Sequence, residues 1–397
     1  MRFPIRGITL TAVAAVGMAA GAVPATASTV AHHPRARAKA ASQAAPPAWK
    51  QVAIPDVPGN LQLSQVTAVS ATDAWAVGST ILLPAGTVEP VVLQWNGTAW
   101  SQFAVAGIPD YVSLTSVAVA NGHVWVSGND NAAGGVVYRL SGTQWVSVAV
   151  PAGMNSVSLA TSPNGQFWAY GGNEGYPYGG DDGPAADMTE IAGYTGTTPQ
   201  AYPTGASTAA AGADLSFASS TDGYAVGTLN GGGPVVLHWN GTAWSTAPAP
   251  VPPKGTIGSL DSVLDTSSAG VWATGALESR SGAVSTWVVH WNGKSWTTVK
   301  VPSAFAPQSL FFDGNISAGE SGGPQWISGN TGTGTTEYLF YAGGTFTAVK
   351  GTTGAPLQSG AVMDLAGVPG SDATWAISAQ LDGTSSAGSA PRIEFAP

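Results

Sequence analysis

The sequence contains no cysteine among its 397 residues, which excludes disulfide bonds and cysteine-based catalytic or metal sites. Charged residues are scarce at 9%, and 22 acidic against 13 basic residues give a formal net charge of −9. Nucleic acids and anionic membranes are bound by basic surfaces, so this composition argues against both as partners. A chain without disulfides must be stabilised by a large hydrophobic core of its own.

Long hydrophobic runs are also missing, apart from one near the start of the chain. Residues 7–23 are apolar but too short for a membrane span; two arginines precede them, and small residues follow at 25–27. This is the pattern of a secretion signal. We therefore predict a signal peptide over residues 1–27, no membrane span, and a secreted, extracellular protein. The Ala- and Pro-rich residues 28–47 are predicted to form a disordered linker.

A short apolar phrase with a central aromatic residue is repeated seven times, as in Asp-Ala-Trp-Ala-Val-Gly at 73–78. Its aromatic residues, at separations of 43 to 56 residues, are Trp75, Trp125, Trp168, Tyr224, Trp272, Trp326 and Trp375. Repeats of this length made of short strands are typical of β-propeller blades. The recurrence of an aromatic residue inside each apolar strand predicts that these rings lie in the core between blades.

A second phrase, Trp-Asn-Gly-Thr-Ala-Trp at 95–100, recurs at 239–244 and, with Lys-Ser in place of Thr-Ala, at 291–296. Asn-Gly is a strong hairpin signal, because both residues accept the positive φ of a type I′ turn. The phrase therefore predicts that the third and fourth strands of a blade are joined by a tight type I′ hairpin.

The two ends of the chain complement each other. The seventh copy stops after a third strand near residues 391–395, whereas residues 48–53 resemble a fourth strand with nothing before it. Their pairing would close the ring and remove two open sheet edges. We therefore predict an all-β fold over residues 48–397, a seven-bladed β-propeller of four-stranded antiparallel blades, closed by the N-terminal strand completing the last blade.

Polar residues at equivalent repeat positions are interpreted as structural. The residues at the repeat position matched to His238 and His290 are Gln94, Arg139, Tyr341 and Glu394. Such variation indicates a solvated strand face and argues against a metal shared by the two histidines. An aspartate precedes the strand-two aromatic at Asp73, Asp222 and Asp372, where it is expected to bond the backbone of its own tight turn.

The sharpest local signal is the insertion of copy three, residues 173–189, on the face that carries the long loops. Carboxylates and tyrosines can hold sugar hydroxyls and stack on a pyranose, so the ligand-binding candidates are Glu174, Tyr176, Tyr178, Asp181 and Asp182. Acid oxygens along a Gly-rich loop suit Ca²⁺, so the metal candidates are Asp181, Asp182 and Asp187. The alternative is a solvated loop, because no spacing here matches an EF-hand.

The repeated phrase, followed by His-Trp-Asn-Gly-Thr-Ala-Trp at 238–244, resembles secreted kelch-like and galactose-oxidase-like β-propeller repeat proteins of actinobacteria. The resemblance covers nearly the whole chain after the predicted signal peptide and implies the fold rather than an activity. The hairpin phrase also resembles the repeats of seven-bladed bacterial lectins, whose sugar sites lie between blades. The copper chemistry of galactose oxidases needs a cross-linked cysteine, which is absent, and the arginine triad of sialidases is not matched by Arg139, Arg280 and Arg392.

These observations predict a secreted, monomeric, non-enzymatic binding propeller that recognises an extracellular glycan or a cell-surface protein. The alternative is a glycan-active hydrolase or lyase that uses carboxylates on the long-loop face. Two carboxylates roughly 5–10 Å apart in a pocket would favour the enzyme, and acids scattered over a flat rim would favour binding.

Overall fold

The computed structural model of the protein describes residues 45–130, 134–151, 154, 157–171, 190–206, 210–229, 232–266, 270–303, 305, 315–320, 323–329, 335–353, 359–381 and 389–397. These residues belong to one compact unit, Gln43–Pro397. The predicted signal peptide and residues 28–44 of the predicted linker lie outside the described residues. No helix among the described residues is long and apolar enough to cross a membrane.

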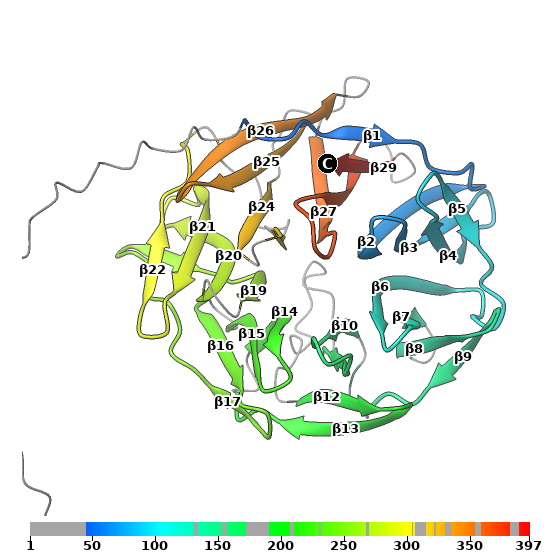
Figure 1. Ribbon diagram of the computed structural model, residues 1–397, viewed down its shortest axis with the longest axis horizontal. Coiled ribbons are helices and arrows are strands. Elements are labelled where there is room, and N and C mark those ends of the chain that lie inside the picture. Colours follow the sequence, from blue (N-terminus) through cyan, green and yellow to red (C-terminus); the bar gives the residue numbers. More distant parts are fainter. Residues whose placement is uncertain are drawn as a thin grey trace, which may run out of the picture. The chain divides into compact units, whose positions relative to one another are not determined.

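Seven antiparallel sheets are arranged as blades around a central axis, each running from an inner to an outer strand (Figure 1). The predicted seven-bladed β-propeller is therefore confirmed. Blades one to three comprise β2 (Asn60–Ser70), β3 (Asp73–Leu82), β4 (Thr87–Trp95), β5 (Trp100–Phe103); β6 (Val112–Ala120), β7 (His123–Asp130), β8 (Gly134–Ser141), β9 (Gln144–Val148); and β10 (Ser158–Thr161), β11 (Phe167–Tyr170), β12 (Glu190–Thr195), β13 (Thr198–Pro203).

Blades four to seven follow in chain order, and in blade five two short strands share the inner position by pairing with the two halves of β20. The blades comprise β14 (Ala210–Ser219), β15 (Asp222–Leu229), β16 (Pro234–Trp239), β17 (Trp244–Thr246); β18 (Thr256–Gly258), β19 (Ser262–Thr266), β20 (Gly270–Ser279), β21 (Val284–Trp291), β22 (Trp296–Val299); β23 (Ile316–Ala318), β24 (Pro324–Gly329), β25 (Thr335–Ala342), β26 (Thr345–Thr353); and β27 (Ser359–Gly367), β28 (Thr374–Leu381), β29 (Ser389–Ala396), β1 (Lys50–Val52).

Blade seven takes its outer strand from the start of the propeller. The antiparallel pairs between β1 and β29 are Lys50–Phe395, Gln51–Glu394 and Val52–Ile393, so the first and last strands lie side by side (Figure 1). Trp49, just before β1, is 6% exposed and stacks on Tyr338 of blade six, with ring centroids 4.0 Å apart. The predicted closure of the ring by the N-terminal strand is confirmed.

A buried carboxylate joins the closing blade to blade six. Glu394 of β29 has 0% exposure, so the predicted solvated face is wrong at this position. Its carboxylate accepts hydrogen bonds from the Tyr338 hydroxyl at 2.6 Å, the Thr336 hydroxyl at 3.0 Å and the Thr352 N–H at 2.6 Å. Burying a charge costs several kcal/mol unless it is compensated, and these donors from β25 and β26 supply that compensation.

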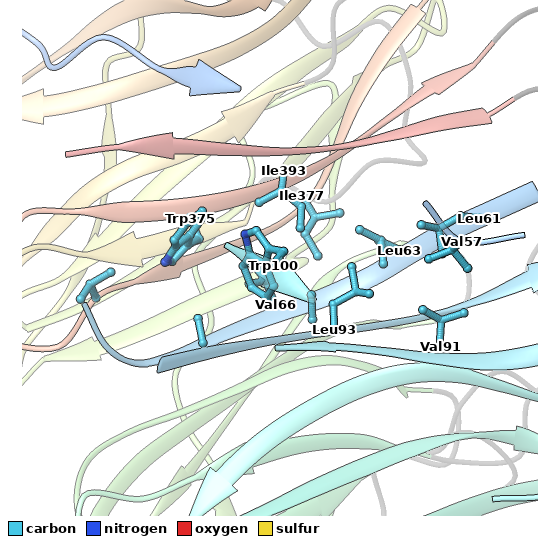
Figure 2. Packing of buried hydrophobic residues seen from close by; sticks show 13 residues of the cluster. Val57, Leu61, Leu63, Val66, Val91, Leu93, Trp100, Trp375, Ile377 and Ile393 are labelled. Atoms are coloured by element: carbon cyan, nitrogen blue, oxygen red, sulfur yellow. The ribbon is translucent and has the colours of Figure 1, made fainter. Parts of the chain in front are cut away.

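Aromatic side chains fill the interfaces between successive blades. The six strand-two tryptophans are at most 5% exposed, which confirms their predicted core position: Trp75, Trp125, Trp168, Trp272, Trp326 and Trp375. The hairpin rings of the following blade cover them. Trp95 and Trp100 of blade one lie 5.0 and 5.2 Å from Trp375 of blade seven, and Figure 2 shows Trp100 beside Trp375 among the apolar side chains of this interface. The hairpin of blade four covers Trp168 in the same way.

The glycine that ends the strand-two phrase is required by a bulge in the inner strand. In blade one the register between β2 and β3 shifts beside Gly78. A Cβ at Gly78 would lie 1.9 Å from the carbonyl oxygen of Gln62, and one at Gly128 would lie 2.2 Å from that of Ser113. Only glycine permits so close an approach of two strands, which explains why the phrase repeats this residue.

The Trp-Asn-Gly hairpins differ from the predicted type I′ turn. Trp95 pairs with Trp100, so the loop has four residues, and only its Gly97 has a positive φ, of 92°. The Asn96 side chain closes the loop by accepting hydrogen bonds at Oδ1 from two backbone N–H groups of the loop, both at 3.0 Å. An asparagine carboxamide thus replaces the second left-handed residue that a type I′ turn needs.

Closure can be tested by truncation. Deletion of residues 28–56 removes Trp49 and β1 and opens the edge of β29, so we expect aggregation or a large loss of stability. Deletion of residues 28–45 is the control, and its melting temperature should match that of the chain beginning at residue 28. Thermal unfolding and size-exclusion chromatography measure both effects. Equal melting temperatures for the two deletions would show that the ring does not need its N-terminal strand.

Candidate ligand-binding site

The residues predicted from the insertion of copy three lie outside the described residues. This applies to the ligand candidates Glu174, Tyr176, Tyr178, Asp181 and Asp182 and to the metal candidate Asp187. Their assignment, including Ca²⁺, stays a prediction. Within the described part of the chain, no group of three or more His, Asp and Glu side chains is placed to hold a metal ion.

The inner strands of all seven blades line a central channel with a volume of about 390 Å³. Its acidic and amide lining residues are Gln65, Asp214, Asp261, Asn315 and Asp364, accompanied by serine and threonine side chains. Neither lysine nor arginine occurs among the described residues that line it. The channel is therefore polar and acidic where the inner strands line it.

The channel carboxylates and amides hold neighbouring blades together. Asp364 of blade seven accepts a hydrogen bond from the Val66 N–H of blade one at 2.9 Å, and Asp214 of blade four accepts one from the Val263 N–H of blade five at 2.9 Å. Gln65 binds blade two in the same manner. Burial raises the pKa of Asp214, and its hydrogen bonds oppose that shift. These side chains therefore have a structural role at the inner strands.

The interface between blades four and five departs from the ring packing of the others. Strand two of blade four carries Tyr224 where the other six blades have tryptophan, and Tyr224 is partly exposed. The hairpin of blade five, which covers this position, carries Trp291 and Trp296, and both are also partly exposed. The equivalents of Trp296 are buried, Trp100 and Trp244 both at 4% exposure, whereas the equivalents of Trp291 differ, Trp239 being 3% exposed and Trp95 partly exposed. The clearest consequence of the smaller tyrosine is therefore the incomplete covering of Trp296.

A pocket of about 280 Å³ opens at this interface, on the face that carries the hairpins; we call it the blade 4–5 pocket. It is lined by Tyr224, His238, Ala247, Pro248, Trp291, Gly293 and Trp296. The rings form two pairs, His238 on Tyr224 with centroids 4.7 Å apart and Trp291 with Trp296 at 5.6 Å. Its lining is therefore largely aromatic, which suits the apolar face of a small ligand.

A half-exposed carboxylate stands at the edge of the blade 4–5 pocket. The His238 Nε2 atom lies 2.8 Å from Asp222 Oδ1, and the two side chains are 34% and 50% exposed. Asp222 was predicted to bond its own turn. That turn is held instead by the Ser219 hydroxyl, which accepts the Thr221 N–H at 3.2 Å. Asp222 is therefore positioned to orient the imidazole of His238 at the pocket and to present negative charge beside it.

A second carboxyl group lies buried behind this edge. Asp265, near the end of β19, is 7% exposed and accepts a hydrogen bond from the Ala218 N–H at 3.1 Å. Burial, and then the charge of Asp222, raises the pKa of Asp265 to about 6. Burial followed by the charges of Asp222 and Asp265 also raises the pKa of Tyr224. The surroundings of the pocket are therefore electronegative once Asp265 is ionised.

His238 occupies the strand-three position that pairs with the strand-two aromatic ring of the same blade. Its equivalents, paired across the strands with that ring, are Gln94, Arg139, His290, Phe340 and Phe395. The predicted Tyr341 and Glu394 are each displaced by one residue from this register. His290 stacks on Trp272 at 4.3 Å. The variation of this position therefore reflects different ways of covering a ring, which corrects the predicted solvated face.

The blade 4–5 pocket was missed from the sequence, although a signal for it exists. Tyr224 is the one strand-two aromatic that is not tryptophan, while the following hairpin keeps both Trp291 and Trp296. A smaller ring opposite an unchanged pair of large rings indicates unfilled volume. The prediction placed Tyr224 in the core with the other strand-two rings and did not compare its size with theirs.

Comparison with known proteins supports the fold. No protein-family model matches the sequence, and no curated protein matches it. The structure of YCF48 bound to D1 peptide is 12% identical, over 89% of this chain and 96% of that chain, with a TM-score of 0.53. Raptor from Chaetomium thermophilum is 13% identical, over 88% of this chain but 29% of its own, with a TM-score of 0.55. YCF48 from Cyanidioschyzon merolae is 14% identical, over 88% and 99%, with a TM-score of 0.51. Such identities show a common propeller fold and nothing further.

The unfilled interface can be tested by restoring the repeat residue. Tyr224→Trp is expected to narrow the blade 4–5 pocket, cover the hairpin rings more fully and raise the free energy of unfolding by about 0.5–2 kcal/mol, as cavity-filling changes do. The matched control is Trp272→Tyr, which reproduces the smaller ring in blade five and should lower stability. Urea unfolding of both variants measures the difference. Destabilisation by Tyr224→Trp would show that the interface is already fully packed.

The raised pKa of Asp265 predicts a pH-dependent stability. A carboxyl whose pKa is higher in the folded chain contributes stability below its unfolded pKa and loses that contribution as the pH rises through about 6. Asp265→Asn should therefore be more stable than wild type at about pH 8, by roughly 1–3 kcal/mol, with no such gain at about pH 4. Urea unfolding at both pH values measures this, with the exposed Asp110→Asn as control. An equal difference at both pH values would contradict the assignment.

Proposed function

We propose that this protein is a secreted, non-enzymatic binding propeller that recognises an extracellular glycan or a cell-surface protein through the blade 4–5 pocket. One observation carries the proposal. This is the interface where the repeated ring packing is incomplete, so that Trp291 and Trp296 remain partly exposed beside a cavity. Exposed tryptophan in a concave site is costly for folding alone and useful for binding.

The chemistry of the pocket favours a glycan. Indole and phenol rings offer flat surfaces on which the C–H face of a pyranose can stack. The half-exposed Asp222 and His238 at its edge can exchange hydrogen bonds with hydroxyl groups. A volume of about 280 Å³ is suited to one sugar unit rather than to an extended chain. The pocket would therefore bind a terminal or protruding residue of a larger glycan.

The arrangement of acids favours binding over hydrolysis. Neither Asp222 nor Asp265 is among the residues that line the blade 4–5 pocket, and Asp265 is buried. The channel acids Asp214 and Asp364 accept hydrogen bonds from neighbouring blades. A glycosidase needs two carboxylates on either side of the scissile bond, and no carboxylate occurs among the described residues that line the blade 4–5 pocket.

A protein partner is the second candidate. The structure of YCF48, which shares the propeller fold at 12% identity, is bound to D1 peptide, so a fold of this kind can receive a polypeptide.

A Ca²⁺ ion held by Asp181, Asp182 and Asp187 is a separate prediction, tested by calcium titration of the wild type and of an Asp181→Asn/Asp182→Asn variant.

The proposed site is tested by screening the secreted protein on a glycan array and measuring the affinity of its best ligand. Trp291→Ala is expected to weaken binding about tenfold or more, as loss of an aromatic anchor does. The matched control is Trp95→Ala, which removes the equivalent hairpin ring of blade one, also partly exposed, and should retain affinity. Equal affinities for both variants would place the ligand elsewhere. Binding to a surface protein with no glycan bound would select the second candidate.

A further inference from the structure

The polar groups of the blade 4–5 pocket are largely used within the protein. The Trp296 Nε1–H donates a hydrogen bond to the Pro248 carbonyl oxygen at 2.7 Å, and Trp291 forms a side-chain hydrogen bond with Tyr224. The indole N–H groups of both hairpin rings are therefore engaged. What these residues offer to a ligand is the π-surface of their rings, and a neutral polyol would find few donors there.

The charge beside the rings is negative. Asp222 stands half-exposed at the edge and Asp265 lies behind it. Among the described residues that line the pocket, only His238 can carry a positive charge, and only when its imidazole is protonated. Lys294 follows the lining residue Gly293 on an exposed hairpin tip. Aromatic faces together with a carboxylate attract a positively charged ligand group, because the ring quadrupole presents negative potential at each face.

From this combination, and resting on the proposed function that the blade 4–5 pocket binds a ligand, we infer that its ligand is a glycan bearing an organic ammonium group, such as an unacetylated amino sugar. The sugar ring would lie against Trp291 or Trp296, and its ammonium group would lie near Asp222. The same features disfavour acidic sugars, whose carboxylates would be repelled by the two aspartates.

The rim of the pocket argues for a glycan rather than a peptide as the source of this group. The loop beside Gly293 has its backbone bonded internally: the Asn292 N–H donates to the Ser295 carbonyl oxygen at 3.3 Å. The Lys294 and Ser295 N–H groups donate to the Asn292 side chain, both at 3.0 Å. A peptide strand that extends a sheet needs free backbone groups, and this loop provides none at these positions.

The test compares each ammonium compound with a neutral relative; the choline pair also matches in shape. Isothermal titration of the full secreted chain uses glucosamine against N-acetylglucosamine, and choline against its uncharged analogue 3,3-dimethylbutan-1-ol. We expect each charged probe to bind more tightly than its neutral match by about 5- to 30-fold, the range of a partly desolvated cation–π contact.

Variants connect the effect to the pocket. Asp222→Asn should reduce the preference for glucosamine over N-acetylglucosamine several-fold, and Trp291→Ala should abolish binding of both charged probes. Asp73→Asn, which changes the equivalent strand-two position of blade one, should leave all affinities unchanged. Equal melting temperatures of wild type and Asp222→Asn would show that the change acts on the ligand rather than on folding.

The outcomes separate this inference from the proposed function. Equal binding of the charged and neutral members of each pair, lost in Trp291→Ala, would overturn the ammonium assignment and leave the glycan site intact. Probe binding that persists in Trp291→Ala would overturn both. Binding of a trimethyl-lysine peptide without glucosamine would overturn the glycan as the source of the group.

Discussion

The propeller depends on one repeated contact, in which the hairpin rings of one blade cover the strand-two aromatic ring of the blade before it. A buried aromatic side chain removes about 150–250 Å² from water, or roughly 4–6 kcal/mol at 25 cal/mol/Å², and the chain has no disulfide to share this load. The contact also governs closure. Trp49 stands beside Trp326 of blade six, with centroids 4.9 Å apart, so the N-terminal segment fills an interface as well as pairing a strand edge.

Where this contact is weakened, between blades four and five, the blade 4–5 pocket opens. Tyr224 has a smaller ring than tryptophan and carries a hydroxyl group. Trp291 and Trp296 of blade five pack toward it and remain partly exposed. The resulting cavity is lined by parts that elsewhere form core. A functional site is often found where local sequence departs from the rule that the rest of the fold obeys. Here the departure is a single substitution in a series of seven, and its neighbours His238 and Asp222 add polarity at the edge.

The fold, its closure and its core rings could be predicted from the sequence because repeats and aromatic spacing report on local strand patterns. The failures have two origins. The predicted turn at Asn96 missed local side-chain hydrogen bonds within its own loop. The other failures concern contacts between distant segments. Glu394 was predicted to be exposed because its repeat position varies, yet donors from blade six bury it. The blade 4–5 pocket depends on the sizes of rings from two blades, which periodicity alone does not compare. The insertion at 173–189 lies outside the described residues, so its candidates remain predictions.

The polar side chains of the propeller divide into two kinds, according to whether they connect blades. Asp214 and Asp364 each accept a backbone N–H from the next blade, so a change there would leave an unpaired donor within the ring and cost about 1–3 kcal/mol. Asp222 and His238 join two strands of a single blade. Their charge and size can change without opening an interface between blades. The pocket edge can therefore be adapted to a ligand while the ring stays closed, whereas the channel, although larger, has little such freedom.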